Sequence, residues 1–139
     1  MTSLSIIRIL LDGGLVVLIW MVQLVIYPSF LYYRTENLIK WHKKYMSSFS
    51  FIVIPLMFGQ LGISICQLIT QPNTYTFISL LIIIVLWIST FIQFAPIHLN
   101  ISNKEVNKKM LISLVNKNWI RTFLWSLLFI YSLFKTNFI

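Results

Sequence analysis

The feature that most constrains this chain is a run of 59 residues, from Tyr45 to Asn103, that contains no Lys, Arg, Asp or Glu. Ordinary soluble domains carry roughly 25% charged residues. The whole chain is similarly apolar, since 58% of its 139 residues are hydrophobic and 10% are charged. Only lipid accepts so much continuous apolar surface. The sequence therefore excludes a soluble globular protein and predicts an all-α, polytopic membrane protein.

Four apolar segments have about the 20 residues that a helix needs to cross a bilayer. They cover residues 4–27, 47–69, 75–94 and 118–138. Pro28 is expected to end or kink the first span, and Pro96 to stop the third. Arg121 and Lys135 lie near opposite ends of the fourth, where long cationic side chains can reach the interface. We expect a four-transmembrane-helix bundle that forms a single domain over residues 1–139.

The basic residues predict how the chain is oriented. The connection after the first span contains four Lys or Arg residues, the next contains none, and the third contains at least four. Because cytoplasmic loops are enriched in Lys and Arg, we expect the first and third connections in the cytoplasm and both termini outside. This placement, in a bacterial inner membrane, accounts for the net charge of +8. A nucleic-acid partner is not needed to explain it.

The two halves of the chain show a weak similarity. Trp20, Gln23 and Pro28 close the first span, while Trp87, Gln93 and Pro96 close the third. Two tandem helical hairpins of the same orientation would produce this pattern. The general preference of Trp and Pro for the membrane interface would produce it as well.

Polar side chains recur at helical spacing inside the apolar spans. Arg8 and Asp12 are four residues apart, so they can form an ion pair on one helix. Each span has a polar stripe that should face its neighbours rather than lipid. These stripes either hold the bundle together, which is the simpler explanation for Gln23 and Gln60, or line a cavity that opens toward the cytoplasm. The cavity interpretation includes Gln23, Gln60, Tyr27, Tyr45, His42, His98, Asn118 and Arg121.

Arg121 is the strongest of these candidates. A guanidinium group cannot lose its proton, so one helical turn inside a membrane it needs an anion, a carbonyl or a ring face. Asp12 is expected at the other side of the membrane, and Glu36 and Glu105 lie in loops. Either the oxygen of a bound ligand or a lipid headgroup would neutralise Arg121.

The two histidines, His42 and His98, are expected on the same side of the membrane. Together they would ligate a haem or a metal, but two imidazoles without carboxylates are weak support for a metal site. Each would also serve as an interfacial hydrogen-bonding group, or as a general base toward an acidic carbon or phenol. We expect no metal and no cofactor. Cys66 is the single cysteine and is expected to be a buried structural thiol.

The chain contains four short motifs in this order: Tyr27-Pro28, Tyr45 followed by Pro55-Leu56-Met57, Pro96-Ile97-His98, and Asn118-Trp119-Ile120-Arg121. Together they resemble the motifs of the anthrone-oxygenase-like family of small four-helix membrane proteins. The resemblance covers nearly the whole chain. His98 stands where the family pattern would have Asn.

The resemblance implies oxygenation of an activated aromatic such as an anthrone, without metal or flavin. It implies functional roles for His98, Asn118, Trp119 and Arg121. An imidazole would deprotonate the substrate, while Arg121 and Asn118 would stabilise the resulting oxyanion. The expected partners are the lipid bilayer, a lipophilic aromatic or quinone-like molecule, and other membrane proteins. A non-catalytic accessory subunit of a membrane complex is the main alternative, and a haem-handling protein is a third.

Overall fold

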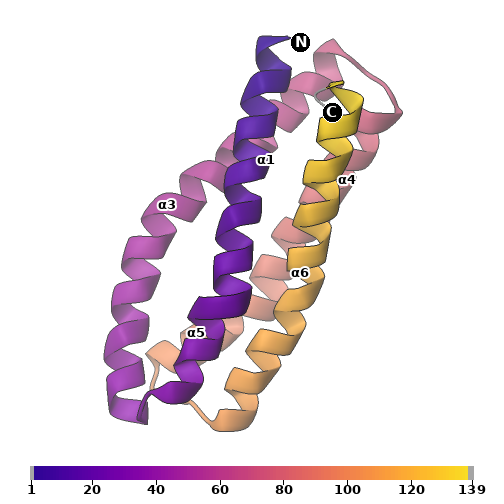
Figure 1. The fold of residues 1–139 in the computed structure, drawn as a ribbon. Helices are drawn as coiled ribbons and strands as arrows, with labels where there is room; N and C mark the ends of the chain where they lie inside the picture. The colour runs from indigo at the N-terminus through magenta and orange to yellow at the C-terminus, as the bar shows by residue number, and fades with distance from the viewer. Residues whose placement is uncertain (1, 138–139) are drawn as a thin grey trace.

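The computed structural model describes residues 2–137, in which every regular element is helical (Figure 1). The prediction of an all-α fold is confirmed for this part of the chain. There are four long helical segments. The first joins α1 (Ser3–Met21), the π-helix η1 (Val22–Ile26), α2 (Tyr27–Ser29) and the 3₁₀ turn η2 (Phe30–Tyr32); the second is α3 (Thr35–Thr70); the third joins α4 (Thr74–Ser89), the π-helix η3 (Thr90–Phe94) and α5 (Ala95–Ser102); the fourth is α6 (Lys108–Lys135).

Consecutive segments run antiparallel and pack side by side as a bundle. Helix α1 contacts α3 and α6, and α4 contacts the same two helices. Both chain ends lie at one end of the bundle, beside the connection between α3 and α4 (Figure 1). We call this the terminal end. The connections around Tyr33–Arg34 and 103–107 lie at the opposite end, which we call the basic end.

Side-chain caps fix where the helices begin. The Thr2 hydroxyl accepts a hydrogen bond from the Ser5 N–H, and the Asn107 side chain accepts one from Met110 N–H. At the start of α4, Asn73 and Thr76 form a reciprocal capping box. Each cap satisfies an N–H group that the first helical turn leaves without a partner.

The prolines do not stop the first and third segments. Pro28 and Pro96 each lie in the first turn of a new α-helical piece, where an N–H group is not required. Each piece follows a five-residue π-helix. The expectation that Pro96 ends the third span is therefore wrong, because α5 continues to Ser102 and places His98 on a helix instead of in a loop.

Within residues 2–137, three segments are long and apolar enough to cross a membrane: Ser3–Tyr32, Thr35–Thr70 and Thr74–Ser102. Helix α6 is not among them, since Lys108, Lys109, Lys117 and Arg121 lower its hydropathy. Helices α3 and α6 begin 12 and ten residues before the expected spans at 47 and 118. The predicted spans covered only the apolar part of each helix, because an apolar run marks what suits lipid. The helices themselves also include the polar residues that precede that run. The expected end at Phe138 lies outside the described residues.

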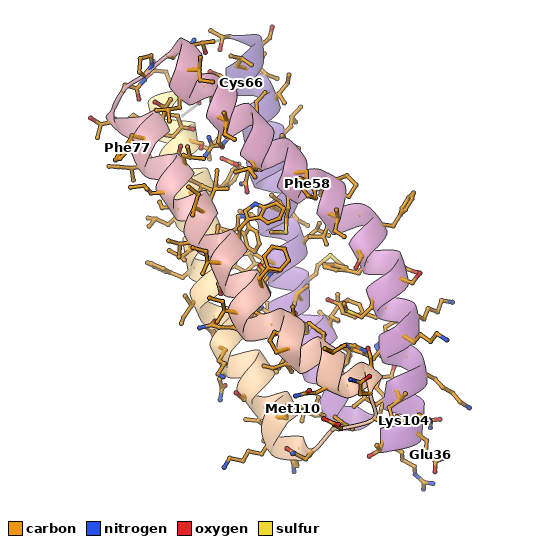
Figure 2. The ribbon with its side chains drawn as sticks, turned by 180° about the vertical axis from the view of Figure 1, so that it is seen from behind. Glu36, Phe58, Cys66, Phe77, Lys104 and Met110 are labelled. Atoms are coloured by element: carbon orange, nitrogen blue, oxygen red, sulfur yellow. The ribbon has the colours of Figure 1, made fainter. Side chains whose placement is uncertain are left out.

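The inside of the bundle contains both apolar and polar side chains, whereas its outer surface is largely apolar. The buried core contains Leu15, Ile83 and Leu128, but fourteen polar or charged residues are buried beside such groups. The outer faces expose large apolar side chains, such as Phe58 at 59% and Phe77 at 55% (Figure 2). Cys66 is exposed on this outer face, so the expectation of a buried thiol is wrong.

Candidate functional site

A buried ion pair stands at the centre of the polar cluster nearest the terminal end. Arg8 Nε donates to both carboxylate oxygens of Asp12 at 2.9 Å, and neither side chain has any exposed surface. The predicted i,i+4 pair is thus confirmed. Arg8 also donates to Gln67 on α3 at 2.9 Å and to Ser79 on α4 at 3.4 Å.

The remaining lone pairs of Asp12 are used as well. Gln60 Nε2 on α3 and Ser132 Oγ on α6 each donate to the Asp12 carboxylate at 2.7 Å. Trp125 Nε1 donates to the side-chain amide oxygen of Gln60, Oε1, at 3.3 Å. Residues from all four helical segments therefore meet at one carboxylate and its guanidinium. Such a network holds helices in register, because each partner removed would leave a buried polar group unsatisfied.

A second cluster joins α6 to the first segment nearer the basic end. Asn118 Nδ2 and the Thr122 hydroxyl donate to Gln23 Oε1 at 2.9 and 3.0 Å, and Gln23 Nε2 donates to the Val115 carbonyl at 3.1 Å. Gln23 and Asn118 are thus occupied with each other. This agrees with the helix-packing interpretation of Gln23 and makes Asn118 a support for its neighbour Arg121.

Arg121 differs from Arg8 in having no carboxylate partner. Among residues 2–137 the only ion pair is that of Arg8 with Asp12. Arg121 is 7% exposed, and its Nη1 donates a long hydrogen bond to Asn118 Oδ1 at 3.5 Å. Its Nε is buried without a partner. The guanidinium lies over the ring faces of Phe94 at 4.3 Å and Trp125 at 5.3 Å, which supply a cation–π attraction.

Arg121 lines a cavity of about 320 Å³ between α3 and the third segment. That volume lies at the lower end of the roughly 300–1,000 Å³ typical of small-molecule sites. The walls are mainly apolar, and the polar groups are gathered at one side. The lining consists of Tyr27, Tyr45, Met46, Phe49, Ser50, Val53, Ile54, Met57, Phe58, Trp87, Thr90, Phe91, Phe94, Ala95, His98 and Arg121.

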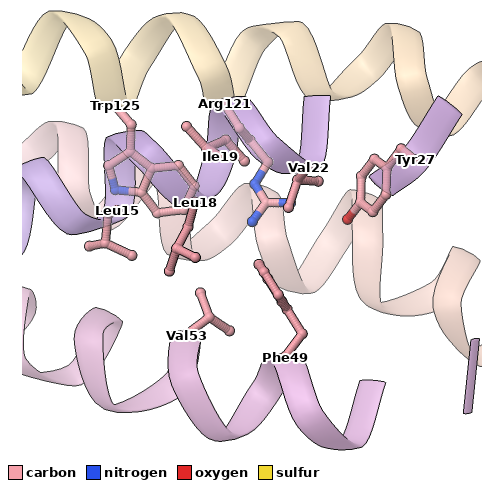
Figure 3. Close-up of a pocket in the computed structure, with 9 residues that line it drawn as sticks. All are labelled: Leu15, Leu18, Ile19, Val22, Tyr27, Phe49, Val53, Arg121 and Trp125. Atoms are coloured by element: carbon pink, nitrogen blue, oxygen red, sulfur yellow. The ribbon is translucent and has the colours of Figure 1, made fainter. Parts of the chain in front are cut away.

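Arg121 also lines a smaller cavity of about 30 Å³. Tyr27, Phe49 and Val53 line both cavities. Figure 3 shows Arg121 reaching from α6 toward Phe49, with Trp125 on one side and Tyr27 on the other. The remaining walls of the smaller cavity are aliphatic side chains of α1 and η1. The guanidinium therefore borders both a small cavity and a larger one.

The two histidines and Tyr27 form a continuous hydrogen-bonded chain. The Tyr27 hydroxyl is 2.9 Å from His98 Nε2, and His98 Nδ1 is 2.8 Å from His42 Nε2. His42 is fully buried, and its Nδ1 has no hydrogen-bond partner. Phe30 packs edge-on against the His42 ring at a centroid distance of 5.8 Å. The chain runs from the cavity wall toward the basic end.

The π-helices help to position this chain. At the end of η1 the N–H of Tyr27 donates to the Val22 carbonyl, five residues back. At the end of η3 the N–H of Ala95 donates to the Thr90 carbonyl, also five residues back. A π-turn changes the direction in which the following side chains point, compared with a continuous α-helix. The side chains that follow the two π-turns, Tyr27 and His98, meet each other.

The structure brings together six of the nine predicted site residues. Tyr27, Tyr45, His98 and Arg121 line the larger cavity, with His42 and Asn118 behind them. The other three lie elsewhere. Gln60 belongs to the Asp12 network, Gln23 is bonded to α6, and Trp119 is 46% exposed and packs against Trp20 on the outer surface.

The apolar walls were not foreseen from the sequence. Phe94 beneath Arg121 and Phe49 between the two cavities are examples. In a chain with eleven Phe residues, an aromatic side chain carries no signal of its own. Spacing relative to Arg121 could not have identified them either, because they belong to other helices.

The histidine geometry bears on metal binding. Two nitrogens that share one iron at about 2 Å would be roughly 4 Å apart. His42 Nε2 and His98 Nδ1 are 2.8 Å apart, which is a hydrogen-bond distance. No cluster of three or more metal-ligating side chains occurs within residues 2–137. The absence of shared metal binding stays a prediction.

No family model, curated protein or solved structure matches this chain.

Proposed function

We propose that the chain is an integral membrane protein of a bacterial inner membrane, with both termini outside. Three apolar segments and exposed apolar outer faces support insertion into lipid. The orientation is supported by the basic end, since Arg34 and Lys104 lie in connections there, while the opposite connection at 71–73 has no charged residue. Within this arrangement, the cavity lies in the half of the bundle that is nearer the cytoplasm.

We propose further that the larger cavity binds a lipophilic aromatic molecule with a weakly acidic oxygen, such as a polycyclic phenol or the enol form of an anthrone. The observation that carries this proposal is Arg121, a buried cation without a carboxylate partner on the wall of an apolar cavity. A phenolate or enolate oxygen would supply the missing anion, and the ring system would contact Phe94, Phe49 and Trp87. Exclusion of bulk water strengthens that attraction.

The reaction that best suits the site is oxygenation by O₂ without a metal or flavin. His98 and Tyr27 would accept the proton of the bound substrate, and Arg121 would stabilise the enolate. The activated CH₂ carbon would then react with O₂, so that the carbon becomes a carbonyl, one oxygen atom remains in the product and the other leaves as water. The smaller apolar cavity beside Arg121 has the size and lining to admit dioxygen.

Binding of 1-naphthol to protein in lipid nanodiscs tests the first part of this proposal. The absorption spectrum of naphthol distinguishes the neutral phenol from the naphtholate in the ground state. We expect saturable binding with naphtholate enriched, and at least about tenfold weaker binding in Arg121→Gln, because one charge-assisted hydrogen bond is worth about 1.5–3 kcal/mol. Lys117→Gln is the matched control, since Lys117 is exposed one turn earlier on the same helix. Equal binding by both variants would disprove the role of Arg121.

Turnover is tested by oxygen uptake with anthrone as substrate. We expect one O₂ consumed per anthraquinone formed, with loss of this activity in Arg121→Gln and His98→Ala. Naphthol binding without anthrone turnover would reject the oxygenase and leave a binding protein. Absence of both would favour the accessory-subunit alternative.

A further inference from the structure

The hydrogen bonds that link Tyr27, His98 and His42 constrain one another's direction. Each of its two contacts joins one donor to one acceptor. A neutral imidazole has one N–H and one bare nitrogen. The direction of the first hydrogen bond therefore fixes the direction of the second.

Only two arrangements of the protons satisfy both contacts. In the outward arrangement, Tyr27 donates to His98 Nε2, His98 Nδ1–H donates to His42 Nε2, and His42 has its proton on Nδ1. In the inward arrangement, His42 Nε2–H donates to His98 Nδ1, His98 Nε2–H donates to Tyr27, and the Tyr27 hydroxyl proton is free to point at the cavity. His42 Nδ1 has no partner in the structure, so no hydrogen bond at the His42 end of the relay selects between the two.

We propose that these three residues form a reversible proton relay, in which His42 is the positioning residue that sets what Tyr27 offers to a bound ligand. This inference rests on the proposed function and deepens it. The outward arrangement presents an acceptor to a phenolic O–H, and the inward arrangement presents a donor to a ketone or quinone oxygen. One site thus binds both the hydroxyl and the carbonyl form of the same aromatic.

The relay also gives the substrate proton a destination. When a ligand O–H bond breaks, its proton goes to Tyr27, the Tyr27 proton goes to His98 Nε2, and the His98 Nδ1 proton goes to His42 Nε2. The ligand is left as an anion beside Arg121, and His42 becomes an imidazolium with a proton on both nitrogens. One proton has moved, and the total charge is unchanged. The cation forms at His42, which does not line the cavity, instead of at His98, which shares the cavity wall with Arg121.

The surroundings of His42 contain few other ionisable groups. Tyr45 lies on its own helix with ring centroids 6.2 Å apart, His98 faces it from α5, and Phe30 covers it from η2. Arg121 on α6 is the charged group that lines the same cavity as His98 and Tyr27. No ion pair with a carboxylate forms there among residues 2–137. His42 is therefore coupled to the ligand mainly through His98.

The test is the ¹⁵N spectrum of the two histidines in nanodisc-embedded protein labelled with ¹⁵N-histidine. Protonated and bare imidazole nitrogens have well-separated chemical shifts, and the wild-type protein contains only these two histidines. With saturating 1-naphthol, the relay predicts a proton on His42 Nδ1, and a second proton on His42 Nε2 in the fraction whose naphthol has ionised. With saturating 1,4-naphthoquinone, it predicts a proton on His42 Nε2 alone and a bare Nδ1. A purely structural histidine that does not contact the ligand would give the same spectrum with both.

A variant pair provides the second measurement. Gln in place of His42 can still hydrogen-bond to His98 but cannot take up a proton, so the pH at which bound naphthol ionises should rise by about one unit in His42→Gln. Lys43→Gln changes the neighbouring exposed residue and should leave that pH unchanged. Binding of naphthol with a His42 tautomer that is identical for both ligands would overturn the relay and leave the proposed function standing. Failure of the wild type to bind either ligand would overturn the proposed function and the relay together.

Discussion

Replacing Asp12 with Ala should be among the most destabilising single changes in this protein. The substitution removes the acceptor for Arg8 Nε, for Gln60 Nε2 and for Ser132 Oγ, and both members of the ion pair are fully buried. Breaking a buried pair by removing one partner costs about 3–5 kcal/mol, because a charge is left uncompensated. We expect a loss of stability in this range.

The double variant Arg8→Met/Asp12→Ala separates the charge from the packing. With both ionised groups gone, no buried charge is left unpaired, so the double variant should be no less stable than Asp12→Ala alone. The summed stability losses of the two single variants would then exceed the loss in the double variant by about 3 kcal/mol or more.

Stability is measured by denaturant-induced unfolding in mixed micelles, with near-UV circular dichroism as the probe, for the wild type, both single variants and the double variant. The reasoning would be refuted by additive losses, within about 0.5 kcal/mol, since additivity is the behaviour of independent sites. A loss below about 1 kcal/mol in Asp12→Ala would refute it as well, because that is the range of solvent-exposed pairs.

Three further predictions concern other parts of the molecule. Gly62→Ala should stabilise the protein by about 0.5–1 kcal/mol, because Gly is unfavourable inside a helix and the added Cβ meets no atom within 4 Å; Gly59→Ala should gain less, because its Cβ would lie 3.3 Å from Leu11, and equal gains in thermal unfolding would count against this packing. In a Cys66→Ser background, a membrane-impermeant maleimide should label Pro72→Cys from outside and Glu105→Cys only from the cytoplasm, and the reverse pattern would invert the orientation. Titration with haemin should give no stoichiometric Soret band, because His42 and His98 hydrogen-bond directly to each other at 2.8 Å; a band that either His→Ala variant abolishes would contradict this.

The apolar pattern of the sequence was enough to predict the helical fold and the local pairing on one helix. Hydrophobic run length depends only on neighbours along the chain, so four long helices and the Arg8–Asp12 pair could be predicted. The ends of the helices were harder to predict from the sequence. Pro28 was expected to end or kink its helix and Pro96 to stop its helix, but a π-turn before each of the two places it in a first helical turn, which the sequence pattern does not indicate.

The candidate site depends on which faces of different helices meet, and only the tertiary structure decides that. Sequence spacing placed Gln23, Gln60 and Arg121 in one group, because each is a polar residue in an apolar span. The fold bonds Gln60 to Asp12 and Gln23 to Asn118, and it leaves Arg121 without an anion beside a cavity. It also joins His42 to His98, 56 residues apart. The sequence reveals that a polar residue in an apolar helix needs a partner or a ligand. Side chains on other helices decide which of the two it has, and the sequence does not show which side chains these are.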